Sequence, residues 1–504
     1  MGIREVVVAP NPSRVELFAA DELARYLELM TGREVRTVGY PSELVDGRIY
    51  IGSAALSEDP HLSREADSLS EDGFLIREKG GKLFIVGGSD RGTLYGAYHL
   101  LWMLGVRWYF PSPNGEFIPF LRTLNLKGLD IREEPDFTRR GIVIHRNNTA
   151  FMRWLNFAPK IKLNTISLHS LDGIEEMEDL TKDNGLQFGL KIHFYEDVIS
   201  IDRWDIDRNR ERTRALLDIL PEKIRELHLW PADGVLKPAS GQEQQPIQDL
   251  ALAFTNEMAD FLREINPDYR MAFLAYWSTW AIPREVRPAE GVFLEMAPIH
   301  RSFSYPVNAP PGTRNGDSVG PIVEGLVEVF DPAETQVLGY WLDSSLFGRG
   351  RFKPWQGRLP FIPEIMRGDL AFYRNLGIRQ IDTFAVGVDV GYLARFTSPT
   401  IFIYPMLLWD LQADVKSEVR LFCRNYFGTE EMAELFVEDE RYDPVDASGV
   451  ELMEYAGHIM DKISIVREIR SGVRDEKALR RISKFEAELS LHAKAPKGAI
   501  HYAN

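Results

Sequence analysis

Acidic side chains stand at or just beyond the ends of three strand-like stretches of this chain. Asp233 follows a stretch in which Leu alternates with His and Trp, and Pro231 ends that stretch. Glu295 lies near the end of a second apolar stretch, and Asp343 follows a third. Hydrolysis of a glycosidic bond needs one protonated carboxyl group and one ionised carboxylate. We therefore take Asp233, Glu295 and Asp343 as the candidate catalytic residues.

Eight strand-like segments, separated by helical or loop segments, follow one another from Arg139 onward. Eight such units in about 250 residues are typical of a (β/α)8 barrel. A doubly wound sheet is a weaker alternative, because no dinucleotide-type glycine loop follows a first strand. In a barrel the C-terminal ends of all strands share one rim, so the acids are expected to converge there. The strands are predicted near 140–146, 162–169, 190–195, 226–231, 270–277, 291–297, 336–342 and 379–386.

Alternation within the strands predicts which acids face the barrel interior. The apolar residues flanking Glu295 are assigned to the helix-facing side, so Glu295 is expected to point inward. In the seventh strand, Tyr340 is assigned to the helices, and Trp341 and Asp343 to the interior. An inward carboxylate without a partner is costly to bury. Two such acids together with Asp233 are more than packing requires.

Aromatic, amide, imidazole and charged side chains gather at the same strand ends. Flat rings suit the apolar face of a sugar, and Asn and His suit its hydroxyl groups. The basic loop 347–353 could bind a sugar carboxylate through paired hydrogen bonds, so an acidic sugar is one hypothesis. The candidate substrate-binding residues are Arg146, Asn147, His169, His193, Glu196, His228, Trp230, Trp277, Arg301, Trp341, Arg349 and Asp382.

Each candidate also has a purely structural interpretation. Asp233 could cap a turn, and Asp343, which precedes Ser344 and Ser345, could cap a helix. Glu295 could pair with an inward Arg or His. The basic loop could be a solvated surface loop, and the tryptophans could belong to the core.

Charge and composition exclude several classes of function. A net charge of -16 argues against nucleic acids and anionic membranes as partners. The lone cysteine, Cys423, excludes an internal disulfide and a cysteine metal cluster. The chain has no His-Glu-x-x-His or calcium-loop spacing and no Gly-x-Ser-x-Gly motif. Neither a metal nor a cofactor is therefore expected.

The sequence also predicts a cytoplasmic location. No apolar run is long enough to span a bilayer. The first residues run straight into the strand-like stretch Val6–Val8 without an apolar signal segment.

The regions on either side of the barrel differ in their periodicity. Residues 1–130 are predicted to form a small α/β domain, with a helix over 13–30 that Ser13 and Glu16 open in capping-box spacing. Residues 401–504 are predicted to be helical and could support a homodimer. The predicted fold is therefore α/β: a (β/α)8 barrel over residues 131–400, between a small α/β domain and a helical C-terminal region.

Several motifs of the first domain occur in a fixed order over about 120 residues. In that order they resemble the non-catalytic domain that precedes the barrel in β-N-acetylhexosaminidases and α-glucuronidases. The whole chain most resembles a bacterial family of unknown function built on that plan, and the resemblance implies a glycosidase. The motifs are Asp72-Gly73-Phe74, Gly87-Gly88, the stretch 91–98 (RGTLYGAY), the stretch 105–109 (GVRWY), Pro111 and Gly115-Glu116.

This resemblance also implies roles for the acids. Hexosaminidases of this clan carry an adjacent Asp-Glu pair after strand four, where this chain has Ala232-Asp233 and lacks one acid. The α-glucuronidases, which invert the anomeric centre, carry a lone acid after strand four and further acids after strands six and seven. Asp233, Glu295 and Asp343 match that layout. By similarity Asp233 is the general acid, and either Asp343 or Glu295 is the base that acts through a water molecule.

These observations together predict an exo-acting glycoside hydrolase that cleaves short oligosaccharides inside the cell. Two alternatives stay open at this point. One is a substrate-assisted β-N-acetylhexosaminidase in which Glu196 or Glu295 replaces the absent acid. The other is a non-catalytic carbohydrate-binding protein on a barrel scaffold.

Overall fold

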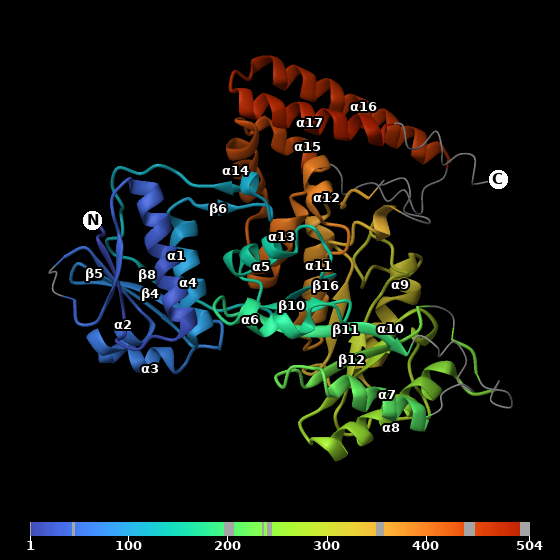
Figure 1. Cartoon of the computed structure of the whole chain (residues 1–504). Coiled ribbons are helices and arrows are strands. Elements are labelled where there is room, and N and C mark those ends of the chain that lie inside the picture. Colours follow the sequence, from blue (N-terminus) through green and yellow to red (C-terminus); the bar gives the residue numbers. More distant parts are fainter. Residues whose placement is uncertain are drawn as a thin grey trace. The chain divides into compact units, whose positions relative to one another are not determined.

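A computed structural model describes residues 2–42, 46–195, 206–233, 236–238, 244–348, 357–437 and 449–493 (Figure 1). Contacts divide the chain into two compact units. Unit 1 holds residues 1–138, 152–165 and 176–188, and unit 2 holds residues 139–151, 166–175 and 189–504. The barrel mouth and the C-terminal helices both lie in unit 2, and the predicted division into three domains stays a prediction.

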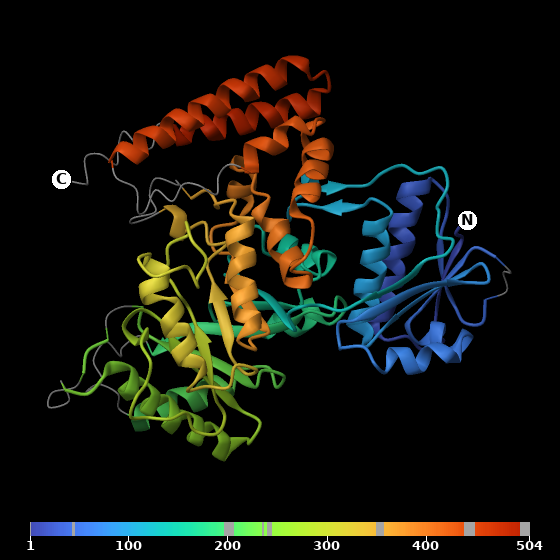
Figure 2. The ribbon, with the colours of Figure 1, turned by 180° about the vertical axis from the view of Figure 1, so that it is seen from behind.

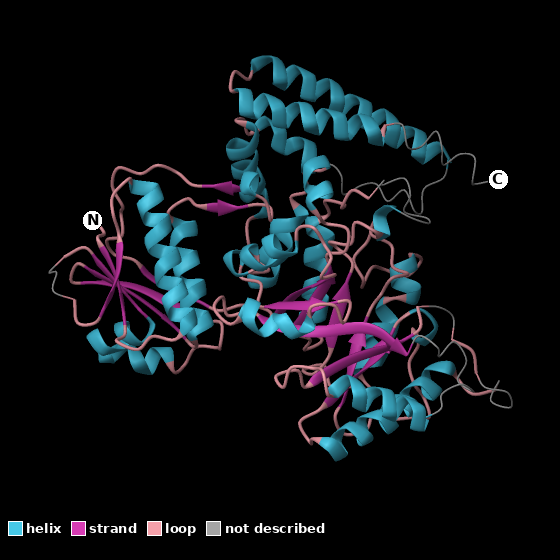
Figure 3. Ribbon diagram, viewed as in Figure 1, coloured by secondary structure: helices cyan, strands magenta, loops and turns pink. Residues whose placement is uncertain are grey.

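Unit 1 is built on a six-stranded mixed sheet (Figure 3). Helices α1 (Arg14–Thr31) and α4 (Asp90–Met103) lie side by side against it. Residues on the opposite face, such as Tyr50 and Phe84, pack with Ala54 of α2 (Gly52–Glu58). In sheet order the strands are β2 (Arg36–Gly39), β1 (Glu5–Val8), β3 (Arg48–Ile51), β5 (Lys82–Gly87), β4 (Phe74–Lys79) and β8 (Asp130–Glu133).

The first helix begins where its capping residues predict. Ser13 Oγ accepts a hydrogen bond from the Glu16 backbone N–H at 3.1 Å, and the Glu16 carboxylate accepts one from the Ser13 N–H at 3.3 Å. Gly32 ends the helix in the left-handed conformation, with φ of 64°. The expected helix is thus confirmed, and it begins and ends one residue later than predicted.

Unit 2 contains a closed barrel of eight strands, which confirms the predicted barrel. Neighbouring strands pair in parallel from β11 round to β9. The strands are β9 (Arg139–Ile144), β10 (Thr165–Leu168), β11 (Gln187–Tyr195), β12 (Glu226–Pro231), β13 (Arg270–Ala275), β14 (Val292–Met296), β15 (Gln336–Gly339) and β16 (Gln380–Phe384).

Helices connect the barrel strands and continue beyond the last of them (Figure 2). The helices between the strands are α5 (Phe151–Phe157), α6 (Met177–Thr181), α7 (Ile206–Leu217), α8 (Ile247–Ile265), α9 (Arg314–Ser318), α10 (Gly320–Val327) and α11 (Pro363–Asn375). Those after the last strand are α12 (Val390–Arg395), α13 (Thr400–Trp409), α14 (Val415–Phe427), α15 (Glu434–Val437), α16 (Gly449–Gly472) and α17 (Glu476–His492).

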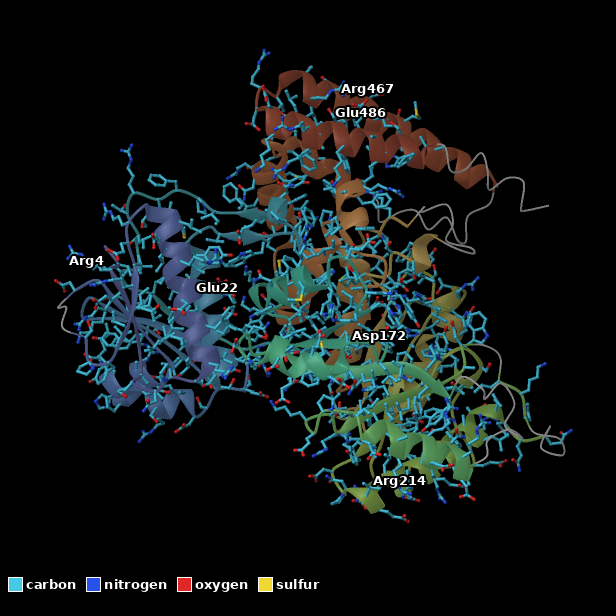
Figure 4. All side chains as sticks on the ribbon, viewed as in Figure 1. Arg4, Glu22, Asp172, Arg214, Arg467 and Glu486 are labelled. Carbon is cyan, nitrogen blue, oxygen red and sulfur yellow. The ribbon has the colours of Figure 1, made fainter. Side chains whose placement is uncertain are left out.

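The last two helices, α16 and α17, run side by side. Arg467 of α16 donates to Glu486 of α17 at 2.7 Å, and both residues are labelled in Figure 4. None of the described helices is both long enough and apolar enough to cross a membrane.

The predicted phase of the seventh strand is wrong by one residue. Strand β15 ends at Gly339, and Leu338 and Tyr340 line the cavity at the barrel mouth. Trp341 instead lies on the outside, where its ring centroid is 5.8 Å from that of Tyr404 in α13. A Cβ on Gly339 would lie 2.2 Å from the Trp341 ring, so only glycine fits beside it.

Candidate active site

A cavity of about 200 Å³ opens at the C-terminal ends of the barrel strands. Each of the eight strands, or the residues just after it, contributes to its lining. This is the face on which barrel enzymes carry their catalytic groups. The lining residues are His145, His169, His193, Trp230, Asp233, Leu274, Tyr276, Ala297, Ile299, Leu338, Tyr340, Asp343, Ser345, Phe384 and Val386.

Two of the three candidate acids line this cavity. Asp233 is exposed and accepts a hydrogen bond from the Tyr276 hydroxyl at 2.8 Å. Asp343 is only 4% exposed. Its Oδ1 accepts hydrogen bonds from the Ser345 N–H at 2.9 Å, the Ser345 hydroxyl at 2.6 Å and the Leu346 N–H at 3.1 Å. Asp343 therefore caps the following turn, as the structural interpretation predicts, and also faces the cavity.

Tyr340 lies within electrostatic reach of both of these acids. Burial raises the pKa of its phenol well above the ordinary value, and the charges of Tyr276, Asp343 and Asp233 raise it further. The Tyr340 phenol is therefore neutral and can act as a hydrogen-bond donor in the wall of the cavity.

Imidazole side chains form another part of the lining. The Nδ1 atoms of His169 and His193 each lie 2.6 Å from a backbone carbonyl oxygen, that of Lys191 and that of Pro231. A carbonyl oxygen can only accept, so each Nδ1 carries the proton. Burial lowers the pKa of His169 to about 4 and also lowers that of His145. His169 is thus neutral at neutral pH, with Nε2 as an acceptor.

Glu295, the third candidate acid, lies beneath the cavity and does not line it. It points inward, as its phase predicts, and it is fully buried. Its carboxylate accepts hydrogen bonds from Lys191 Nζ at 2.5 Å, His228 Nδ1 at 2.7 Å and Trp230 Nε1 at 2.9 Å. Glu295 was one of the two residues expected to serve as the base. Trp230 lines the cavity and donates its indole N–H to Glu295 beneath it, so Glu295 is not placed to contact a water molecule in the cavity.

The charges around Glu295 compensate one another. Burial by itself raises the pKa of a carboxyl group, but His228 and Lys191 outweigh burial and hold the pKa of Glu295 below its ordinary value. Burial also lowers the pKa of His228, in spite of the neighbouring Glu295. The structural interpretation of Glu295, a pairing with an inward cation or His, describes this geometry.

Three further candidates are held in structural contacts away from the cavity. Asp382 is fully buried and pairs with Lys191 at 2.7 Å and Arg139 at 3.0 Å. Arg301 forms a buried ion pair with Asp369. Buried opposite charges thus hold Asp382 and Arg301, Trp341 faces the helices, and none of the three lines the cavity. Their contact with a substrate stays a prediction.

The remaining candidates lie around the barrel or outside the described residues. The Arg146 guanidinium lies 4.7 Å from the centre of the Phe151 ring. Asn147 is exposed, and Trp277 is 42% exposed on the loop after β13. Glu196 and Arg349 lie outside the described residues, as does most of the basic loop that follows Gly348.

Four polar lining residues were not among the predicted site residues: His145, Tyr276, Tyr340 and Ser345. His145 directly follows β9 and Tyr276 directly follows β13, so the rule that strand ends carry the site could have found both. Tyr340 was missed because the phase of its strand was misassigned. In the described part of the chain, no group of three or more His, Cys, Asp or Glu side chains is placed to hold a metal ion.

Sequence comparisons agree with the motifs of unit 1. Residues 2–100 match the family described as "Glycosyl hydrolase family 67 N-terminus". The chain is 26% identical over 159 residues to a protein named probable α-glucuronidase A from Aspergillus clavatus. That alignment covers 27% of this chain and 19% of the relative, so the match spans about a fifth of the relative's length.

Comparisons with solved structures extend the similarity to the barrel. A family GH115 4-O-methyl-α-glucuronidase has a TM-score of 0.65 at 13% identity, covering 98% of this chain and 72% of that one. A β-N-acetylhexosaminidase from Bacteroides fragilis has a TM-score of 0.54 at 14% identity, covering 88% of this chain and 92% of that one. These neighbours share the fold: a small α/β domain and a (β/α)8 barrel.

The predicted resemblance is thereby confirmed. The chain carries a domain similar to the N-terminus of glycosyl hydrolase family 67, followed by a barrel unit. The relatives and structural neighbours named above are glycoside hydrolases.

Proposed function

We propose that this protein is a glycoside hydrolase whose active site is the cavity at the barrel mouth. The observation that carries the proposal is the convergence of Asp233 and Asp343 on one small hollow. Its rings, imidazoles and phenols are the side chains that bind sugars. The similarity of unit 1 to the family 67 domain supports the same class.

In this proposal the two acids have different roles. Asp233, which is exposed and bonded to Tyr276, donates a proton to the glycosidic oxygen as the bond to the leaving group breaks. Asp343, whose Oδ1 accepts three hydrogen bonds, takes a proton from the water that attacks the anomeric carbon. The reaction inverts the anomeric centre.

The shape of the cavity supports action at chain ends. Trp230 lies at the inner end of the cavity, and the charged cluster around Glu295 fills the barrel beneath it. The small volume of this cavity, about 200 Å³, supports the proposal of exo action on short oligosaccharides. We also propose a cytoplasmic location and leave the homodimer as a prediction.

An acidic sugar is the more specific proposal, supported by the α-glucuronidase relative and by the basic residues after Gly348. We propose Arg349 or Arg351 as the cation for a sugar carboxylate, because the sequence of the loop 347–353 is rich in basic residues. Replacing both by Ala is expected to raise KM on an acidic glycoside only. An unchanged KM would remove this proposal.

The test is a panel of 4-nitrophenyl glycosides and short oligosaccharides, including uronides and N-acetylhexosaminides. Asp233→Asn, purified identically, controls for contaminating enzymes. We expect the wild type to release a single terminal sugar from one class, with inversion seen by NMR. No hydrolysis of any member, or equal hydrolysis by Asp233→Asn, would contradict the proposed function. Fast cleavage of an N-acetylhexosaminide with retention would favour the substrate-assisted alternative.

A further inference from the structure

One tryptophan at the rim of the barrel has an unusual backbone and an exposed ring. Trp277 has φ of +47°, in the left-handed region that bulky residues rarely adopt. Among the described residues, Lys162 is the other non-glycine residue with a positive φ. The side chain of Trp277 is 42% exposed, although an indole gains most from burial. The conformation is therefore unfavourable locally and places the ring in solvent.

The residues around Trp277 hold this conformation in place. Trp277–Thr279 form a single 3-10 turn directly after Tyr276. Thr279 Oγ1 accepts a hydrogen bond from the Tyr276 N–H at 3.1 Å and donates one to the Leu274 carbonyl at 2.7 Å. Strained backbone that is fixed by its surroundings is concentrated at ligand-binding sites.

Trp277 is adjacent in sequence to a residue that lines one side of the cavity. Its ring lies 4.5 Å from the ring of His300, between centroids, so the pair joins the loops after β13 and β14. Their sequence neighbours, Tyr276 and Ile299, both line the cavity. Tyr276 also donates its hydroxyl hydrogen to Asp233 at 2.8 Å. Trp277 thus sits outside the cavity, next to the residue that holds the proposed acid.

We propose that Trp277 is a stacking platform for the leaving group. The preferred substrates would then have a leaving group that contains a ring, either a pyranose or an aryl group. The inference rests on the proposed function. A general acid must lie beside the bond between the retained sugar and the leaving group, so the leaving group projects outward past Asp233. There the exposed indole offers a flat face, with His300 packed against it.

The test compares two substrates of the same sugar, whichever the panel identifies. One is the disaccharide or 4-nitrophenyl glycoside, whose leaving group contains a ring. The other is the glycosyl fluoride, whose leaving group has none. Trp277→Ala is expected to lower kcat/KM about tenfold on the first, as for one lost stacking contact, and to leave the second within about twofold. Trp277→Phe is expected to recover most of the loss.

Two controls separate stacking from folding. Trp102→Ala removes another exposed tryptophan, 36% exposed in α4 of unit 1, and is expected to change neither substrate. Trp277→Gly and Trp277→Ala both lack the ring, but Gly tolerates a positive φ. The Gly variant is therefore expected to melt at the higher temperature.

The possible outcomes separate a failure of the Trp277 proposal from a failure of the proposed function. An equal loss on both substrates in Trp277→Ala would overturn the platform while leaving the hydrolase intact. If the wild type cleaves no glycoside at all, the proposed function fails and the platform fails with it.

Discussion

The mouth and the interior of the barrel both gather carboxyl groups, but they surround them differently. At the mouth, Asp233 and Asp343 accept hydrogen bonds from the hydroxyls of Tyr276 and Ser345 and face a hollow. In the interior, Glu295 contacts Lys191, which also pairs with Asp382 and completes a buried cluster. Acids compensated by buried cations serve the fold, whereas acids beside neutral donors at a cavity remain available for proton transfer.

Substitution of Asp343 at the barrel mouth should have the largest effect, a loss of activity. Asp343→Asn removes the proposed base but preserves an oxygen that can accept from Ser345 and Leu346. We expect kcat to fall by about 10²–10⁴-fold on every substrate, the glycosyl fluoride included, because each needs an activated water. Circular dichroism should show a wild-type fold. Activity within a few-fold of the wild type would exclude Asp343 as the base.

Substitution of Glu295 in the barrel interior should mainly reduce the stability of the fold. Glu295→Gln removes one of the two carboxylates that Lys191 contacts, so the buried positive charge loses part of its compensation. We expect a loss of up to about 3–5 kcal/mol in the free energy of unfolding measured with urea. Adding Lys191→Met should recover part of that loss, because the under-compensated lysine is then gone and Asp382 keeps Arg139 as its partner. A fully stable Glu295→Gln protein with kcat reduced a thousandfold would instead place Glu295 in the chemistry.

Trp230 joins the two regions, so its substitution should have a mixed and smaller effect. Trp230→Phe keeps a ring at the cavity but removes the hydrogen bond from Nε1 to Glu295. We expect a loss of about 1–3 kcal/mol in stability, since a buried acceptor loses a donor. KM should rise more than kcat falls. The matched variant Trp341→Phe, outside the barrel, should leave KM unchanged.

The smallest effect concerns pH. His169 has a pKa of about 4 in the fold, below its ordinary 6.5, so the unfolded chain binds more protons between these values. Stability should therefore fall as the pH drops from 6.5 to 4 and be unaffected by His169 above 6.5. The slope is at most about 1.4 kcal/mol per pH unit. In His169→Gln the unfolding midpoint should depend less on pH over this range, and an unchanged slope would contradict this origin.

Local patterns predicted the elements well. The capping residues Ser13 and Glu16 placed the first helix. Alternation predicted that His228 and Trp230 share one face of their strand, and both bond to Glu295 inside the barrel. The eight predicted strands all overlap those observed. Strand ends also indicated Asp233 and Asp343, since parallel strands must share one rim.

Partners distant in sequence could not be predicted in the same way. Lys191 and Glu295 are 104 residues apart, and Arg301 and Asp369 are 68 apart, so no local pattern shows that these charges neutralise one another. The end of β15 at Gly339 also has a tertiary cause. The ring of Trp341 packs beside that glycine, and Asp343, two residues further along the chain, lines the cavity.

The central claim is that Asp233 donates the proton at this cavity. The most direct test is how the loss of kcat/KM in Asp233→Asn depends on the leaving group of the substrate. The measurement is kcat/KM of the wild type and Asp233→Asn on a disaccharide and on the 2,4-dinitrophenyl glycoside of the same sugar. The dinitrophenolate departs without a proton, so the variant should lose about 10³-fold on the disaccharide and less than about tenfold on the aryl glycoside. Equal losses on the two substrates would contradict the account.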